Sequence, residues 1–432
     1  MMKTIITNAT VITMNEQNEV ILSGAVAFEG SKLVYVGPTP EDLSAYDEVI
    51  DGRHKYILPG LINTHGHAGM ALLRGYADDL PLQQWLEDKM WPMEAQFTAD
   101  HVKWGTHLSI VEMIRTGTTT FVDMYDHMGV VGQAVAETGM RARLCRGIIG
   151  LCSEAEQQAK LQDAVSFAKE WHLQADGRIT VMMAPHAPYT CPPDFIRQLV
   201  DKAEELDLPM HIHMSETQFE VEQNVKDYGA RPVAHLEKLG VFNRPTLVAH
   251  AVHLTDEEID ILANYQVRVS HNVISNLKLA SGVAPVPKML EKGIRVSLGT
   301  DSSASNNNLN LFEELKLAAI LHKGVLNDPV AVPAEQALRM ATRYGADGVF
   351  QSEQLGSLEV DKQADLIMLD ANQAHFHPVQ HPISHVVYAA NGRDVTDTIV
   401  AGKFLMRNRE LLTIDEEKAI YEANRLFDQL KR

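Results

Sequence analysis

Two histidines separated by one residue, His65 and His67, directly follow the apolar run 58–63. Side chains alternate along a strand with a period of two, so both imidazoles are expected on the same face. Neutral imidazoles presented by a rigid backbone are good ligands for a divalent metal. Because the chain has 19 histidines, the pair alone is weak evidence, and it indicates a metal site only if further ligands join it.

Residues that can bind a metal or move a proton also end the other apolar runs in the middle of the chain. A single buried histidine is most often a packed core residue, but each buried polar group costs free energy unless its hydrogen bonds are replaced. Histidines at five strand ends and an aspartate at a sixth therefore favour convergence on one site. Besides His65 and His67, the residues are His186, His211, His213, His250, His271 and Asp301, with Glu216 three residues after His213.

The residue types in this set predict a catalytic metal site. Four of them would offer three nitrogens and one oxygen and leave a coordination position for water, as catalytic sites do. Cysteine, a common ligand of structural zinc sites, is absent from the set. The expected ligands are His65, His67, His213 and Asp301.

Proton transfer is assigned to residues beside the ligands. Glu216 could reach the attacking water without binding the metal, although a glutamate at a helix start is also common. Asp301 would act both as ligand and as base, and His250 would donate a hydrogen bond to the attacking oxygen or orient it. His211 and His271 could support the ligands from behind, and His211 could equally be a packing residue.

The elements that must position these residues read as a repeated strand–helix pattern. Eight such units over roughly 250 to 300 residues match the size of a TIM-type (β/α)8 barrel, whose functional groups lie at the C-terminal ends of its strands. Helix-like segments include 164–171, 195–206 and 257–265. The predicted strands are 58–63, 118–123, 142–146, 179–185, 208–214, 246–250, 267–271 and 294–299.

Both ends of the chain are rich in short β-like runs, and a helix is expected over 414–430 from its apolar spacing. We therefore expect an α/β protein in which residues 1–57 and 359–432 form a small β-sandwich domain and residues 58–358 form the catalytic barrel. The terminal runs lie at 4–13, 25–36, 365–369, 385–389 and 398–400.

The longest predicted connection, residues 68–99, follows the first barrel strand. It carries Trp85, Met90, Trp91 and Met93, which could line a ligand pocket or pack against the barrel rim. Packing is the more common role for such a group.

Composition and charge narrow the range of partners. The formal net charge of −19 at pH 7 argues against binding to nucleic acid or to an anionic membrane. Three cysteines exclude a disulfide framework, and the N-terminal residues turn polar too early for a signal peptide. We expect a cytoplasmic protein that does not bind membranes, and homo-oligomerisation stays open.

Six segments together carry a family resemblance over nearly the whole chain: 58–67 (LPGLINTHGH), 213–216 (HMSE), His250, 270–276 (SHNVISN), 299–301 (GTD) and 356–367 (GSLEVDKQADLI). They resemble the motifs of the amidohydrolase superfamily, in particular those of its aminohydrolases with one metal per site. Within it, the chain resembles the 5-methylthioadenosine/S-adenosylhomocysteine deaminases through 81–86 (PLQQWL), 91–94 (WPME), Arg146 and 184–188 (APHAP).

The resemblance implies one divalent metal per chain at the four expected ligands, usually zinc, with Fe2+ or Mn2+ as alternatives. It also implies a small-molecule nucleoside substrate. The fourth predicted strand ends in His186 and not in lysine, so a carbamylated lysine bridging two metals has no candidate there. The implied substrate contacts are Glu94, Arg146, His186 and Glu216, with Trp85 in the same pocket.

The expected reaction is hydrolytic deamination of adenosines that carry a 5′-thioether, such as 5′-methylthioadenosine and S-adenosylhomocysteine, to the inosine analogues and ammonia. Two alternatives stay open. The rim loops could select guanine, cytosine or a triazine for the same metal site, or the chain could be a catalytically silent binding protein. The complete ligand set together with Glu216 argues against the silent protein.

Overall fold

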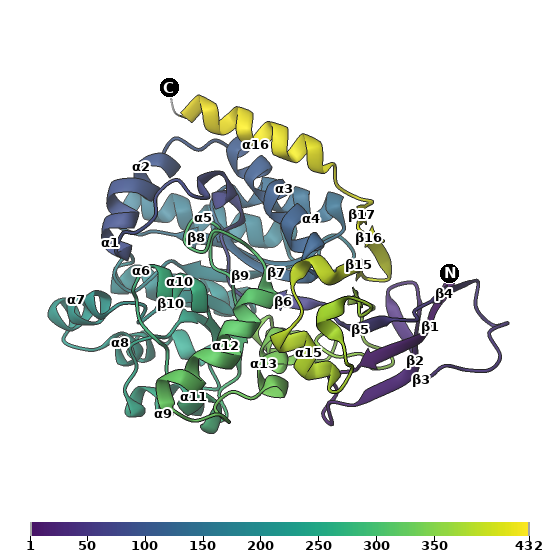
Figure 1. Ribbon diagram of the computed structural model, residues 1–432. Helices are drawn as coiled ribbons and strands as arrows, with labels where there is room; N and C mark the ends of the chain where they lie inside the picture. The colour runs from purple at the N-terminus through teal and green to yellow at the C-terminus, as the bar shows by residue number, and fades with distance from the viewer. Residues whose placement is uncertain (1, 431–432) are drawn as a thin grey trace.

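The structure of the chain, a computed structural model, describes residues 2–430 and contains two β-sheets within them (Figure 1). One sheet is parallel and forms a barrel, and the other is mixed and lies beside it. The barrel strands are β6 (Leu61–Asn63), β7 (Thr118–Tyr125), β8 (Arg141–Ile148), β9 (Ile179–Pro185), β10 (Met210–Met214), β11 (Thr246–His250), β12 (Arg268–His271) and β13 (Val296–Leu298). The mixed sheet consists of β1 (Lys3–Ile12), β2 (Val20–Glu29), β3 (Lys32–Pro38), β4 (Glu48–Asp51), β5 (Lys55–Pro59), β14 (Leu366–Asp370), β15 (Val395–Val400), β16 (Lys403–Arg407) and β17 (Glu410–Leu411).

The barrel strands follow one another in chain order from β6 to β13, and each neighbouring pair is parallel. The barrel closes where a parallel bridge joins Gly66 to Asp301 and where Thr64 N donates to Leu298 O at 2.9 Å. This arrangement confirms the predicted TIM-type barrel. Because the strands are parallel, their C-terminal ends lie on one rim.

Helices cover the outside of the barrel (Figure 1). The C-terminal helix α16 also packs on the barrel, since Arg115 of α3 donates to Glu416 of α16 at 2.9 Å. The α-helices are α1 (Leu82–Trp85), α2 (Trp91–Glu94), α3 (Ala99–Arg115), α4 (Met128–Thr138), α5 (Glu154–Trp171), α6 (Pro193–Glu205), α7 (Gln218–Tyr228), α8 (Pro232–Lys238), α9 (Asp256–Asn264), α10 (Val273–Lys278), α11 (Val286–Glu291), α12 (Leu311–Leu326), α13 (Ala334–Ala341), α14 (Arg343–Gly348), α15 (Pro382–Tyr388) and α16 (Glu416–Leu430). Shorter helical turns are η1 (Ala68–Leu73), η2 (Leu86–Met90), η3 (Val241–Asn243), η4 (Ala374–Phe376) and η5 (Gly392–Asp394).

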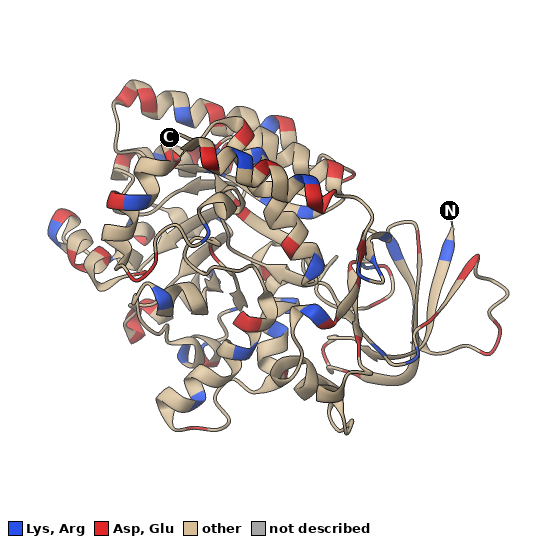
Figure 2. Cartoon of the chain, turned by 45° about the horizontal axis from the view of Figure 1, so that its top comes forward, with Lys and Arg blue, Asp and Glu red and all other residues tan. Residues whose placement is uncertain are grey.

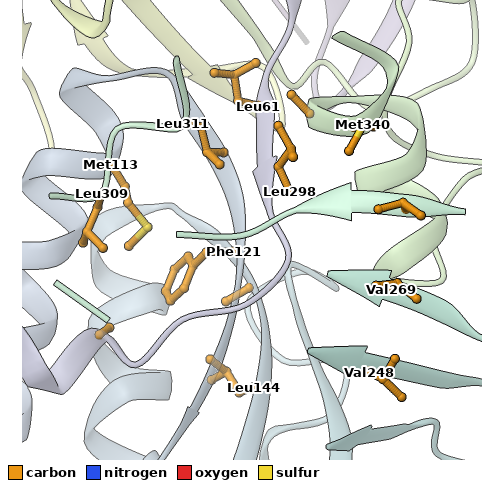
Figure 3. Close-up of a cluster of buried hydrophobic side chains, with 14 of the residues drawn as sticks. Leu61, Met113, Phe121, Leu144, Val248, Val269, Leu298, Leu309, Leu311 and Met340 are labelled. Atoms are coloured by element: carbon orange, nitrogen blue, oxygen red, sulfur yellow. The ribbon is translucent and has the colours of Figure 1, made fainter. Parts of the chain in front are cut away.

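The barrel strands are buried on both faces. On β7, Phe121 belongs to the large cluster between strands and helices, whereas its neighbour Val122 belongs to the cluster inside the barrel. Leu144 and Cys145 of β8 alternate in the same way. Part of the outer cluster is drawn in Figure 3. Such two-sided burial explains why these strands read as continuous apolar runs, which is typical of parallel sheets covered by helices.

Both ends of the chain contribute to the mixed sheet. The strand β14 pairs antiparallel with β5, and β5 pairs parallel with β1, so residues more than 300 positions apart lie in adjacent strands. The sheet has its own buried cluster, which includes Ile6, Ile57, Leu366 and Ile399. The expected second β unit from both termini is therefore present as one mixed sheet.

The predicted first strand, 58–63, is divided at Gly60 between the two sheets. Residues up to Pro59 belong to β5, and residues from Leu61 belong to β6. A Cβ at position 60 would collide with the side chain of Thr119, so only glycine lets the chain pass from one sheet to the other here. The prediction of one continuous strand was wrong for this reason.

The predicted strand 385–389 is also wrong, because these residues lie in or just after the helix α15. Ile383, Val386 and Val387 are buried on one side of that helix, at spacings of three and four residues. Pro382 occupies the first turn, where its missing N–H costs no hydrogen bond. The β-branched residue types misled the prediction, and packing against α13 decides in favour of the helix.

The long first connection is folded into η1, α1, η2 and α2. Trp85, Met90 and Met93 are buried in a separate apolar cluster over the barrel rim, which also contains Leu279. This cluster gives the rim a rigid apolar wall.

Acidic and basic residues are interspersed along the outer helices (Figure 2). Within the described part of the chain, no helix is both long and apolar enough to cross a membrane.

Candidate active site

The residues expected to bind a metal lie together at the C-terminal rim of the barrel. His65 and His67 follow β6, His213 lies near the end of β10, and Asp301 follows β13. The ring centroids of His65 lie 4.8 Å from His67 and 4.7 Å from His213. Parallel strands that end at one rim bring these residues together from positions 65 to 301.

The donor atoms of this cluster are close enough to share one ion. Asp301 Oδ1 lies 3.2 Å from His67 Nε2 and 3.6 Å from His65 Nε2. One set of ligand atoms within 4.8 Å of one another comprises His65, His67 and His213, and a second comprises His65, His250 and Asp301. His250 is therefore nearer to the ligand set than the sequence indicated.

Hydrogen bonds fix which nitrogen of each imidazole faces the centre. His67 Nδ1 donates to Met124 O at 2.6 Å, and His213 Nδ1 donates to His186 O at 2.7 Å. A ring that donates through Nδ1 presents the lone pair of Nε2 to the centre. Both rings are therefore in the tautomer that a divalent metal requires.

His211 fixes the third imidazole. Its Nδ1 donates to Leu247 O at 2.9 Å, so its Nε2 accepts from His65 Nδ1, also at 2.9 Å. His65 Nε2 is then a buried lone pair without a hydrogen-bond partner among the described residues. Such an orphaned atom fits a metal ligand, because an unpaired buried polar atom is otherwise costly.

The Asp301 carboxylate is held on three sides. Its Oδ2 accepts from Ser275 Oγ at 2.6 Å and from Ser305 Oγ at 3.0 Å, and its Oδ1 accepts from Ser302 N at 2.7 Å. Although burial opposes ionisation, the contacts with His67 and Ser275 hold the pKa of Asp301 well below its ordinary value. The group is therefore an anion, as a carboxylate that binds a metal must be.

Glu216 follows β10 and lies beside the ligand set. Burial, reinforced by the charge of Asp301, raises the pKa of Glu216 to about 8. Both oxygens of Glu220 accept backbone N–H groups at 2.8 Å, one from Ser215 and one from Glu216. Glu220 thus fixes the loop that carries Glu216. A carboxyl with a pKa near neutrality is suited to move protons at neutral pH.

His250, at the end of β11, faces Glu216 with Nε2 lying 3.7 Å from Glu216 Oε2. Its Nδ1 lies 2.8 Å from Asn276 Oδ1, an acceptor, and 3.3 Å from Asn272 Nδ2, a donor. The two amides therefore support either tautomer of the ring, so Nε2 can donate or accept toward the centre.

Three residues at the same rim have strained backbone. Ser215, His250 and Asp301 have φ values of 52°, 74° and 59°, in the left-handed region that non-glycine residues seldom adopt. Each such residue costs on the order of 1–3 kcal/mol, and such strain is typical of functional sites.

A pocket of about 640 Å3 opens above the ligand set. All of the expected substrate contacts line it, namely Trp85, Glu94, Arg146, His186 and Glu216. Trp91 lines it as well, whereas Met90 and Met93 are packing residues in the rim cluster.

Glu94 is held by a tyrosine that the sequence analysis missed. Tyr125 OH donates to Glu94 Oε1 at 2.5 Å, which leaves Oε2 available to a ligand. Tyr125 ends β7, two residues beyond the predicted strand 118–123, so it was not among the strand-end residues considered from the sequence. His186 accepts or donates at Nδ1 with Thr190 Oγ1, 3.0 Å away, and keeps its other nitrogen for the pocket.

Two cations line the outer part of the pocket. Arg146 is paired with Asp163 at 2.7 Å and with Asp126 at 3.0 Å, so its charge is already neutralised. Lys160 of α5, which the sequence analysis did not select, donates to Ile149 O at 2.8 Å. Among residues 2–430 no carboxylate is ion-paired with it, although its charge helps to lower the pKa of Glu156 on the same helix. Lys160 is thus the cation still able to bind an anionic group.

His271 does not join the site. Both of its ring nitrogens are buried without a hydrogen-bond partner in the described chain, and its ring lies 5.9 Å from that of His322. It does not line the pocket. Its position at a strand end was therefore not sufficient to place it beside the metal ligands.

The comparison with known families agrees with this geometry. A model described as "Amidohydrolase family" matches residues 56–405 of the chain. The chain belongs to the amidohydrolase family. This amidohydrolase is similar over nearly its full length to curated bacterial proteins named 5-methylthioadenosine/S-adenosylhomocysteine deaminase. The one from Halalkalibacterium halodurans is 51% identical, with 99% of each chain covered. The one from Dictyoglomus thermophilum is 53% identical, with 89% of this chain and 90% of that protein covered.

Solved structures of other amidohydrolases share the fold. An adenosine deaminase from Xanthomonas campestris with bound zinc is 36% identical, has a TM-score of 0.94, and is matched over 100% of this chain and 99% of that chain. A zinc complex of an atrazine chlorohydrolase from Arthrobacter aurescens is 26% identical, has a TM-score of 0.92, and is matched over 98% and 100%. Both nucleoside and triazine chemistry therefore occur on this scaffold.

Proposed function

We propose that this amidohydrolase removes the 6-amino group of adenosines that carry a 5′-thioether, in particular 5′-methylthioadenosine and S-adenosylhomocysteine. The observation that carries the proposal is a single pocket that joins the ligand set to Glu94 and Glu216. The chain is 51% and 53% identical to two proteins named 5-methylthioadenosine/S-adenosylhomocysteine deaminase, over 99% and 89% of its length, and this similarity supports the substrate class.

The metal would be held by His65, His67, His213 and Asp301, whose Nε2 and carboxylate oxygen atoms face one another. Zinc fits a set of three imidazoles and one carboxylate. When bound, the ion polarises the attacking water and lowers its pKa.

The chain's own groups move the protons. Glu216, whose pKa is raised to about 8, holds a proton near neutral pH and delivers it to the ring nitrogen beside the amino-bearing carbon. That carbon then becomes more electrophilic. Asp301, an anion in its buried setting, accepts the proton of the attacking water. His250 donates through Nε2 to the oxygen that develops charge, and Asn272 supports the tautomer this requires. Asp301 then passes its proton to the amino group, the proton of the added hydroxyl returns to Glu216, and the carbon–nitrogen bond breaks with release of ammonia.

Glu94 and the tryptophan wall select the nucleoside. The free Oε2 of Glu94 can accept from the ribose hydroxyl groups, and hydrogen bonds to a charged group are the stronger kind. Trp85 and Trp91 offer an apolar surface on which a thioether packs well.

The proposed substrate class is tested by release of ammonia from a panel of compounds. The zinc-loaded protein is expected to deaminate 5′-methylthioadenosine, S-adenosylhomocysteine and adenosine, with little action on free adenine, guanine or cytosine, because a free base leaves the ribose contacts unmade. Values of kcat/KM measured side by side decide the matter. Preference for a free base or for a triazine would refute the substrate while leaving the metal hydrolase intact.

Lys160→Met is expected to separate the two thioether substrates. S-adenosylhomocysteine carries an amino-acid carboxylate that Lys160 can bind, and 5′-methylthioadenosine carries none. We expect kcat/KM for the former to fall roughly tenfold, the size of one exposed charge-assisted hydrogen bond, with the latter unchanged. Lys169→Met, on the exposed face of the same helix, is the control. Equal losses for both substrates would exclude this role.

A further inference from the structure

The opposite end of the barrel, at the N-terminal ends of the strands, contains a buried arginine without a counter-charge. Three arginines near this end are at least nine-tenths buried: Arg141, Arg143 and Arg178. Arg141 is paired with Asp365 at 2.7 and 3.0 Å, and Arg178 donates to backbone carbonyls, including that of Val135 at 3.3 Å. Arg143 has neither kind of partner in residues 2–430.

Arg143 lies on β8 and points into the barrel. Its neighbour Cys145, two residues later, belongs to the cluster inside the barrel, and side chains alternate along the strand. The Arg143 side chain stacks over the ring of Phe350, with its central carbon 5.6 Å from the ring centroid. Its Nε is buried without a hydrogen-bond partner in the described chain. Burial alone lowers the pKa of Arg143 to about 10, which still leaves it charged at neutral pH.

Other unpaired donors lie at the same end of the barrel. Thr180 is the register partner of Arg143 on β9, and Thr120 lies on β7 at the same end of the barrel. The hydroxyls of both threonines are buried and lack partners among the described residues. The Nε of Arg268 on β12 is also buried without a hydrogen-bond partner among them. The central guanidinium carbon of Arg268 lies 5.2 Å from the centroid of the Phe350 ring. All of these groups can donate a hydrogen bond.

A surface pocket of about 390 Å3 opens beside Arg268. Its lining includes Arg268, Arg295 and Asp347. Asp347 is the acid that faces these arginines, and its nearest contact is with Arg295, where Nε lies 3.8 Å from Oδ2. One partly shared carboxylate against three guanidinium groups leaves the region positive, in a chain whose net charge is −19.

Leaving a charge buried and unpaired costs several kcal/mol, so a bound counter-ion would stabilise the fold. We propose that the floor of the barrel, defined by Arg143, Arg268, Thr120 and Thr180, binds one small inorganic anion. The ligand is of the chloride or phosphate class, because the donors are hydroxyl and guanidinium groups. The site lies at the opposite end of the barrel from the metal ligands and is independent of the deaminase proposal.

The direct experiment is a crystal of the zinc-loaded protein soaked in sodium bromide, with bromide located by its anomalous scattering. A peak within hydrogen-bond distance of the Arg143 guanidinium or the Thr180 hydroxyl is expected. Ordered water at this place, without an anomalous peak, would overturn the proposal. This measurement needs no variant.

The second experiment measures Tm at constant ionic strength while sodium chloride or sodium phosphate replaces sodium gluconate, whose anion is much larger than chloride or phosphate. Binding to the folded state alone should raise Tm with saturation, on the order of 1–3 °C. The arm that gives the rise identifies the anion as a halide or an oxyanion.

Arg143→Met is expected to abolish this rise, because it keeps most of the side-chain volume and removes the charge. Arg197→Met, which removes the same charge from the exposed helix α6, is the matched control and should keep the rise. An anion also able to bind the metal would raise Tm equally in all three proteins. An equal rise in Arg143→Met and in the unaltered protein would therefore refute the site.

Discussion

Glu216→Gln is expected to retain the metal and to lose roughly 10²- to 10⁴-fold in kcat, which is the usual contribution of a positioned acid–base group. The amide keeps the shape of the side chain, and Glu220 still fixes the loop through the backbone N–H groups of Ser215 and Glu216. What is lost is the carboxyl proton that the raised pKa of Glu216, about 8, makes available near neutrality. The measurement is steady-state turnover of 5′-methylthioadenosine together with metal content.

Glu222→Gln is the matched control for this variant. Glu222 lies on the exposed face of α7, six residues further along the chain, so the same substitution there should leave kcat unchanged. Near-normal turnover of Glu216→Gln would remove Glu216 from proton transfer, and loss of metal from that variant would make it a ligand.

His213→Ala and Asp301→Ala are expected to lose both the metal and the activity. Each removes one donor from the small set whose atoms face one another, and Asp301 is the only carboxylate within it. The unaltered chain should bind about one metal ion, and chelation should abolish turnover while most of the fold survives, because the barrel has its own apolar core. Elemental analysis, activity and thermal unfolding test these expectations together. Two tightly bound ions per chain would contradict the single-metal site.

His211→Ala separates a supporting role from a ligand role. His211 fixes the ring of His65 by accepting from its Nδ1 at 2.9 Å, yet its own nitrogens face away from the metal. Loss of such a supporting hydrogen bond typically weakens metal affinity by about 10- to 100-fold. We expect the variant to lose activity at low zinc and to recover it at high zinc, which the His213→Ala variant should not do.

The sequence alone determined the barrel and the metal cluster because both depend on local pattern. Strands buried on both faces are mostly apolar, so they can be recognised as apolar runs in the sequence. Functional side chains of such barrels follow the strand ends, and this position identified His65, His67, His213 and Asp301 as candidates. For the same reason the predicted strands 179–185 and 246–250 coincide with β9 and β11. Secondary structure was predicted wrongly where the local pattern is ambiguous. The two examples are the change of sheet at Gly60 and the helix α15, which was predicted as a strand.

Only the tertiary structure decided how the site is supported. The bond from His65 to His211 joins residues 146 positions apart, and the bond from Tyr125 to Glu94 joins elements whose spacing carries no common pattern. Asp126 and Asp163 neutralise Arg146 only after the strands and helices have packed. Lys160 is then the cation left available in the pocket. Local periodicity fixes which face of an element a residue occupies. The partner on that face is set by the packing of distant elements, which a single sequence does not encode as a readable pattern.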